Sequence, residues 1–207
     1  MATDFPHLRS FQHCKKDIDL VCFRLPEICP LCGNSTSTGC RIPPFVLTSP
    51  LSSSQEAPHS VVLKPTHGDF MSAYSTICNL HIGITDRFGF VHDFDESGLH
   101  RGSLWPDCLV VMSFCSGQRE VLDQSLEIFC QQPAWDKSRY RENEWNCFDF
   151  VYEFLHYVRH PEVTPVMTRA EFCDKFVSQK KKSVEGYISL YRQARQNGCV
   201  VVPKKIL

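Results

Sequence analysis

The chain has 207 residues, of which 43% are hydrophobic and 22% charged, and its formal net charge is -1. This length suits one domain with a sizeable core, and the balanced charge gives no reason to expect a nucleic acid or an anionic membrane as partner. No apolar run reaches the ~18 residues of a transmembrane helix, and residues 1–10 lack the apolar core of a secretory signal. The twelve cysteines are therefore expected in the reducing cytoplasm or nucleus, where metal binding, catalysis or core packing is commoner than disulfides.

Residues 1–42 are rich in cysteine and predict a small zinc-knuckle element. Cys29-Pro30-Leu31-Cys32-Gly33 is a tight turn that brings two thiolates toward one Zn²⁺ ion. We expect Cys14 as a third ligand and one further ligand. The candidates for that fourth position are His13, Cys22 and Cys40. The alternative is a pair of reduced cysteines in a loop.

Residues 43–59 are rich in proline and serine and are predicted to form a flexible linker or long loop. A domain of residues 60–207 is expected to follow. Short strands are predicted at 61–64, 80–85, 90–94, 108–114 and 199–202, and 80–94 has the pattern of a hairpin. In its first strand His81 and Gly83 lie on the face opposite Ile82 and Ile84.

Apolar residues at helical spacing predict an amphipathic helix over 119–130 and a second helix that begins at Cys147. Asn146 is a favourable N-cap for the second helix, and His160-Pro161 ends it. Thr168 to Glu171 resembles a capping box and is expected to start a third helix, and a further helix is expected over about 184–196. Strands with helices between and after them predict an α+β fold.

Cys147 and His81 are the candidate catalytic pair. The N–H groups and the positive dipole end at a helix start lower the pKa of a thiol there, and a histidine can take its proton. His92, on the predicted return strand, is a third candidate. The alternative is that Cys147 is a core residue on the apolar stripe of its helix and that the histidines are incidental.

The motifs His-x-Gly-Ile (from His81), a second strand, and Asn-Cys-x-x-Phe-Val (from Asn146) resemble the circularly permuted papain-like superfamily. That group includes lecithin:retinol acyltransferase-like proteins, PPPDE-type isopeptidases and NlpC/P60 relatives. The resemblance implies an antiparallel sheet packed on the helix that bears the cysteine. It also implies Cys147 as nucleophile and His81 as base, with His92 orienting the base. An acidic residue such as Asp93 is our alternative for the orienting role.

Two functions remain open from the sequence. One is a thiol hydrolase or acyltransferase that acts on a peptide or acyl substrate through an amide, isopeptide, thioester or ester bond. The other is a non-catalytic adaptor that keeps the fold and binds a protein partner.

Overall fold

The computed structural model describes residues 7–72 and 74–204, and the chain divides into two compact units. The first unit comprises residues 50–184, and the second combines residues 7–49 with residues 185–204. These limits differ from the expected ones, because the C-terminal segment belongs with the N-terminal one. The segment 43–59, expected as a linker, also contains regular structure. It holds most of β3 (Ile42–Val46), the short strand β4 (Leu51–Ser52) and the 3-10 turn η1 (Ser54–Glu56).

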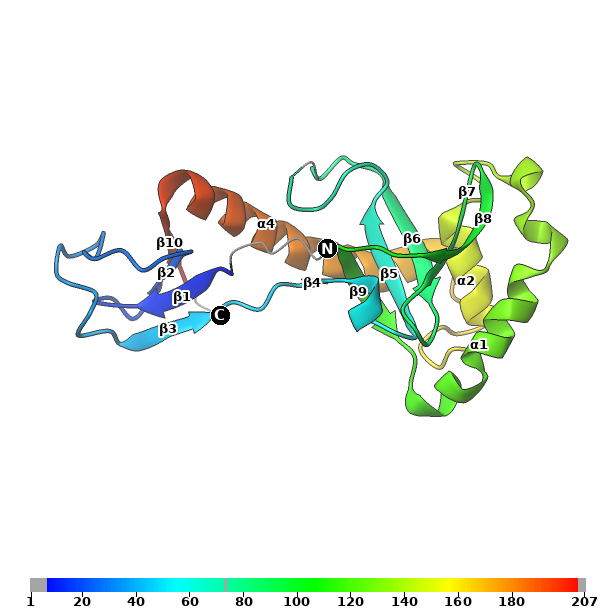
Figure 1. Ribbon diagram of the computed structural model, residues 1–207, viewed down its shortest axis with the longest axis horizontal. Coiled ribbons are helices and arrows are strands. Elements are labelled where there is room, and N and C mark those ends of the chain that lie inside the picture. The colour runs from blue at the N-terminus through cyan, green and yellow to red at the C-terminus, as the bar shows by residue number, and fades with distance from the viewer. Residues whose placement is uncertain (1–6, 73, 205–207) are drawn as a thin grey trace. The chain divides into compact units, whose positions relative to one another are not determined.

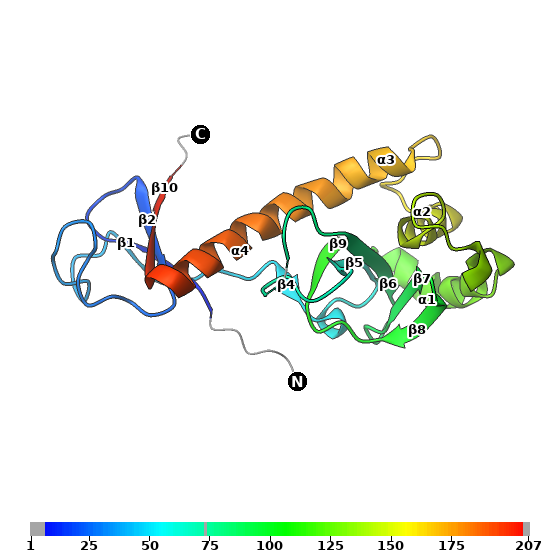
Figure 2. The same cartoon turned by 90° about the horizontal axis from the view of Figure 1, so that it is seen from above.

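Within the described residues, the first unit contains a six-stranded antiparallel sheet (Figures 1 and 2). Its strand order is β4, β9 (Cys108–Ser113), β5 (Ser60–Pro65), β6 (Leu80–Thr85), β7 (Val91–Asp95) and β8 (Gly98–Ser103). The strands expected near 61–64, 80–85, 90–94 and 108–114 correspond to β5, β6, β7 and β9. The expected hairpin is β6–β7. Strand β8 was not expected, because its sequence, GLHRGS, has little of the apolar alternation that marks a strand.

The register of the β6–β7 hairpin determines which side chains share a face. Ile84 pairs with His92, and Thr85 pairs with Val91. Because paired residues point to the same face and side chains alternate along a strand, His92 lies on the Ile84 face. Asp93 lies on the opposite face, together with His81.

The helices of the first unit pack through an aromatic core. Helix α1 (Ser116–Cys130) contacts α2 (Cys147–Tyr157) through Phe129, whose ring centroid lies 5.6 Å from that of Phe150 and 5.2 Å from that of Phe154. Along the chain, α1 and α2 are connected through the 3-10 turns η2 (Pro133–Trp135) and η3 (Lys137–Arg139). Helix α2 packs on β6 and β7, so its first residue is held beside the hairpin.

After α2 the chain is helical from Arg169 to Asn197, although we expected two separate helices. The run consists of α3 (Arg169–Phe172), the π-helical turn η4 (Cys173–Ser178) and α4 (Gln179–Asn197). The predicted capping box is present, since the Thr168 side chain accepts the Glu171 N–H and the Glu171 carboxylate accepts the Thr168 N–H. No helix among the described residues is long and apolar enough to cross a membrane.

The second unit contains a four-stranded antiparallel sheet with strand order β10 (Cys199–Pro203), β2 (Ile18–Cys22), β1 (Arg9–Gln12) and β3. Figure 2 shows β10 beside β2. The small core beneath this sheet consists of Phe11, Leu20, Cys22 and Cys29. The sheet includes the final strand expected at 199–202, and the two sheets with their helices confirm an α+β fold.

Gly83 allows β7 to lie against β6. A Cβ at this position would come within 2.6 Å of the Val91 Cγ1 atom and 2.9 Å of the His92 carbonyl oxygen. We therefore expect Gly83→Ala to lower the free energy of unfolding by about 1–3 kcal/mol, because the crowded groups include backbone. Urea denaturation measures this effect, with Gly117→Ala as control because a Cβ there meets nothing within 4 Å. Equal losses in both variants would contradict the explanation.

Candidate functional site

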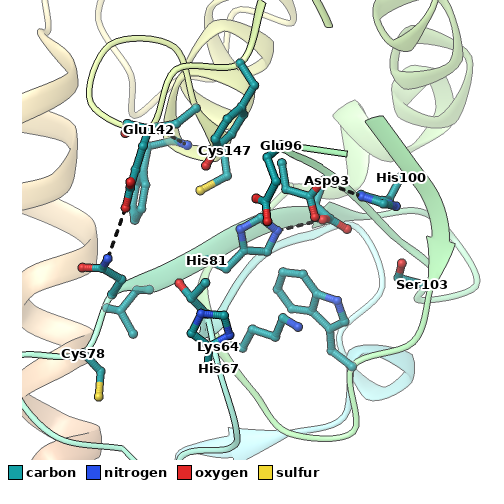
Figure 3. Close-up of a pocket in the computed structure, with 18 of the residues that line it drawn as sticks. Lys64, His67, Cys78, His81, Asp93, Glu96, His100, Ser103, Glu142 and Cys147 are labelled. Carbon is teal, nitrogen blue, oxygen red and sulfur yellow. Dashed lines mark hydrogen bonds and ion pairs between the residues drawn. The ribbon is translucent and has the colours of Figure 1, made fainter. Parts of the chain in front are cut away.

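A pocket of about 860 Å³ opens in the first unit where β6, β7 and β8 meet the start of α2. His81, Asp93 and Cys147 line it together, and in Figure 3 the Cys147 sulfur points toward the His81 imidazole. Strongly polar side chains surround this group. They are Lys64, His67, Asp95, Glu96, His100 and Glu142. His81 and Cys147, which are 66 positions apart in the sequence, therefore face one cavity.

Cys147 is the first residue of α2, and a capping box holds the helix start. The Asn146 side chain accepts the N–H of Phe148 at 2.8 Å, and the Asp149 carboxylate accepts the N–H of Asn146 at 2.9 Å. Arg169 in turn donates to Asp149. These contacts satisfy the N–H groups of Asn146 and Phe148 on either side of Cys147, and they fix the backbone that carries the sulfur.

The N–H of Cys147 itself has no hydrogen-bond partner within residues 7–72 and 74–204. A helix-start N–H of this kind can donate to a developing oxyanion. The N–H of Phe148 is already taken by Asn146. Of these two N–H groups, that of Cys147 is therefore the one that can take this role.

His81 is buried and has two polar partners. Its Nε2 atom lies 2.7 Å from the Asp93 Oδ2 atom, and the ring packs 5.6 Å from that of Trp105 between centroids. Burial opposes protonation of the imidazole, but the hydrogen bonds to Asp93 and Cys147 outweigh it and raise the pKa of His81 from 6.5 to about 9. His81 is therefore an imidazolium at neutral pH, with its positive charge beside the sulfur.

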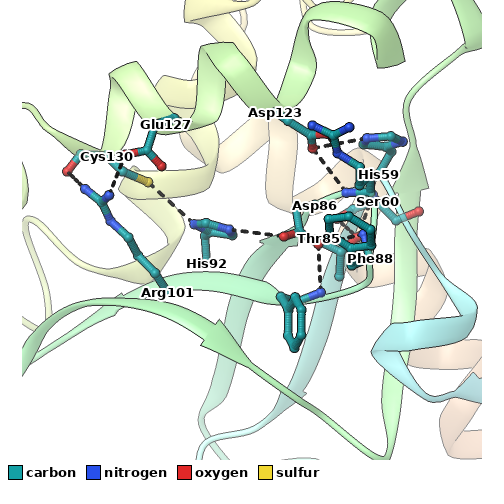
Figure 4. Close-up of polar contacts among 12 residues, drawn as sticks. His59, Ser60, Thr85, Asp86, Phe88, His92, Arg101, Asp123, Glu127 and Cys130 are labelled. Atoms are coloured by element: carbon teal, nitrogen blue, oxygen red, sulfur yellow. Dashed lines mark hydrogen bonds and ion pairs between the residues drawn. The ribbon is translucent and has the colours of Figure 1, made fainter.

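His92, the third predicted catalytic residue, lies away from this pocket. The β6–β7 register puts it on the other face of the sheet. Its Nδ1 atom is 3.8 Å from the Cys130 sulfur and its Nε2 atom is 3.9 Å from the Asp86 carboxylate (Figure 4). Burial lowers the pKa of His92 and raises that of Cys130 to about 12. Here a neutral imidazole meets a protonated thiol. Asp93, the acidic alternative that we expected, is the residue that contacts His81.

Protonation of His81 should stabilise the folded chain. Because the pKa is raised on folding from 6.5 to about 9, the stabilisation is complete below about pH 6.5 and is lost as the pH rises through about 9. The shift corresponds to about 3 kcal/mol. We expect the free energy of unfolding to fall by roughly this amount over that interval in the wild type and to change much less in His81→Gln. If the free energy of unfolding, measured by urea denaturation, depends on pH equally in the wild type and in His81→Gln, the expectation is wrong.

In the second unit, four of the predicted metal ligands come together. One ligand atom from each of His13, Cys14, Cys29 and Cys32 lies within 4.8 Å of the others, so the cluster could hold a metal ion. Cys22 lies outside this set and packs in the small core, opposite Cys199 on β10. Of the three candidates for the fourth position, His13 is the one that the fold brings to the other cysteines.

The surroundings of the cluster fit a metal ligand set. The His13 Nε2 atom lies 3.0 Å from the Ser35 carbonyl oxygen and 3.1 Å from that of Thr38. Since carbonyls only accept, the proton is on Nε2, and Nδ1 accepts from the Cys32 thiol at 3.3 Å. A metal ion in place of that thiol proton would be bound by the same Nδ1 lone pair. Burial opposes ionisation of Cys29, but the N–H groups of Leu31 and Cys32 outweigh it and lower its pKa to about 7. Both features suit a thiolate–imidazole site.

Comparison with known proteins places both regions in one family. The DUF4796 C-terminal profile matches residues 44–194, and the DUF4796 N-terminal profile matches residues 6–35. The chain belongs to the DUF4796 family. The first match includes the Cys147 pocket, and the second includes the Cys29–Cys32 turn. Both regions are therefore parts of the family sequence and not additions to it.

The chain is also similar to the MKRN2 opposite strand protein of Homo sapiens. The two are 30% identical over 199 residues, which are 94% of this chain and 88% of the relative. The sequence as a whole predicts this relation to the vertebrate makorin opposite-strand protein, and the comparison confirms it. No solved structure matches the chain, and the papain-like resemblance stays a prediction.

Proposed function

We propose that the chain is a cysteine-dependent hydrolase or acyltransferase that uses Cys147, His81 and Asp93. The observation that carries this proposal is the shared pocket of the three side chains, with the His81–Asp93 hydrogen bond at 2.7 Å. Acyl-transfer chemistry of this kind uses a nucleophile, a base and a third group that orients the base. The resemblance to papain-like proteins supports the same roles for Cys147 and His81.

The reaction would proceed in two steps. The Cys147 thiolate attacks the acyl carbon and forms a C–S bond, while the N–H of Cys147 stabilises the oxyanion. The bond to the leaving group then breaks, and the His81 imidazolium gives its proton to that group. In the second step His81 takes a proton from water or from an acceptor alcohol or amine, which attacks the thioester and releases Cys147.

An activated aryl ester tests this proposal. We expect mass spectrometry to find the acyl group on Cys147, and we expect Cys147→Ser to lose that adduct. Because the imidazolium is the acid of the first step, turnover should decline as the pH rises through about 9, the pKa of His81. Acylation at other cysteines with none at Cys147 would refute the proposal. It would favour the alternative of a non-catalytic adaptor, in which Cys147, only 5% exposed, is a core residue.

We propose further that the cluster of His13, Cys14, Cys29 and Cys32 binds a structural Zn²⁺ ion. Three thiolates and one imidazole are a common ligand set for structural zinc. The proposal is supported by the proximity of the four ligand atoms and by the carbonyls that orient His13. Zinc would join the loop after β1 to the turn at Cys29, and thereby stabilise a unit with a small core.

A further inference from the structure

A second group of potential ligands lies within the pocket of the first unit. Asp93 is directly opposite His100 in the β7–β8 pairing, and Asp95 is two residues further along β7. All three side chains therefore project from the same face of the sheet. One ligand atom from each lies within 4.8 Å of the other two, and all three residues line the pocket.

Asp93 carries an unused acceptor at this point. Its side chain is 5% exposed, and its Oδ2 atom accepts from His81. Its Oδ1 atom is buried and has no hydrogen-bond partner within the described residues. An unpaired buried carboxylate oxygen is costly, and a cation is one of the few groups that satisfy it.

The neighbouring side chains are available for the same cation. His100 Nε2 and Asp95 Oδ1 lie 2.8 Å apart, so these two ligand types already meet. His100 and Asp95 are only partly buried, and Figure 3 shows His100 near Asp93 beside the cavity. A cation could therefore enter from the pocket, where it would replace the hydrogen bond between His100 and Asp95.

We infer that Asp93, Asp95 and His100 form a divalent-metal site, and that Zn²⁺ is the ion it fits best. One imidazole and two carboxylates match zinc better than Mg²⁺ or Ca²⁺, which prefer oxygen ligands alone. Three protein ligands leave a coordination position for water or a ligand in the pocket. This site is separate from the cysteine cluster of the second unit and does not depend on it.

Asp93 belongs both to the proposed metal site and to the hydrogen bond with His81. Metal binding should therefore affect the chemistry of the Cys147 thiol. A cation bound at the Asp93 Oδ1 atom would withdraw electron density from the same carboxylate whose Oδ2 atom accepts from His81, and would weaken that hydrogen bond. The metal should therefore loosen the orientation of His81 and slow acyl transfer at Cys147. This consequence rests on the proposed function, whereas metal binding itself does not.

Zinc per chain, measured by elemental analysis after dialysis against buffered free Zn²⁺, tests the inference. We expect His100→Ala and Asp95→Asn each to hold one zinc fewer than the wild type at a free concentration that saturates the wild type. The control is His67→Ala, which removes an exposed pocket histidine outside the group, and it should hold as much zinc as the wild type. Circular dichroism checks that the variants fold.

The difference between proteins, and not the total, decides the outcome. If the cysteine cluster holds no zinc, the wild type still exceeds His100→Ala by one ion, so failure of the structural-zinc proposal is distinguished from failure of this one. Equal zinc in the wild type and in a folded His100→Ala variant overturns the inference. So does an equal loss in His67→Ala, because zinc would then bind pocket histidines without selecting this group.

Discussion

Iodoacetamide should alkylate Cys147 rapidly in the native protein, and His81→Ala should slow that reaction about 100-fold. The positive charge of His81, whose pKa is about 9, faces the Cys147 sulfur in the pocket and would stabilise negative charge on that sulfur as it attacks the reagent. A contribution of two orders of magnitude is typical for a positioned acid–base group. Peptide mass spectrometry after timed quenching measures the rate at each of the twelve cysteines.

Two comparisons make this measurement specific. Cys78 lines the same pocket, and its rate should not change in His81→Ala. His92→Ala serves as the matched histidine variant, because His92 faces Cys130 on the other side of the sheet, and it should leave the Cys147 rate unchanged. If Cys147 is alkylated only on unfolding while surface cysteines react, the thiol chemistry is wrong and Cys147 is a packing residue.

Removal of the proposed structural zinc should unfold much of the second unit. The core of this unit is small, and structural zinc sites contribute on the order of 10 kcal/mol to the folding of such elements. We expect Cys32→Ser, or treatment with a strong chelator, to release one zinc per chain. Amide hydrogens of β1 and β2 should then exchange at least about 100-fold faster.

Cys40→Ser is the control for the zinc experiment. Cys40 lies in the same unit but outside the cluster, and its sulfur donates to the Thr36 carbonyl at 3.4 Å, a contact that serine can reproduce. This variant should keep its zinc and its exchange protection. A Cys32→Ser protein with as much zinc and as much protection as Cys40→Ser would contradict the proposed ligand set.

The sequence alone determined the local elements that carry the candidate site. Apolar alternation predicted the hairpin strands β6 and β7, and helical spacing with the Asn146 cap predicted the start of α2 at Cys147. The turn at Cys29 could also be recognised, because proline, glycine and two cysteines at fixed spacing act over a few residues. These features depend on short-range sterics and hydrogen bonds, which a sequence pattern records directly.

Only the tertiary structure decided which of these residues meet. His92 and Asp93 are adjacent in the sequence, and the pairing of Ile84 with His92 determines that Asp93, and not His92, reaches His81. Likewise, the pairing of β10 with β2 assigns the C-terminal strand to the N-terminal unit, and the fold brings His13 rather than Cys22 to the cysteine cluster. Strand register and long-range pairing depend on the summed packing of many residues, which no local pattern contains.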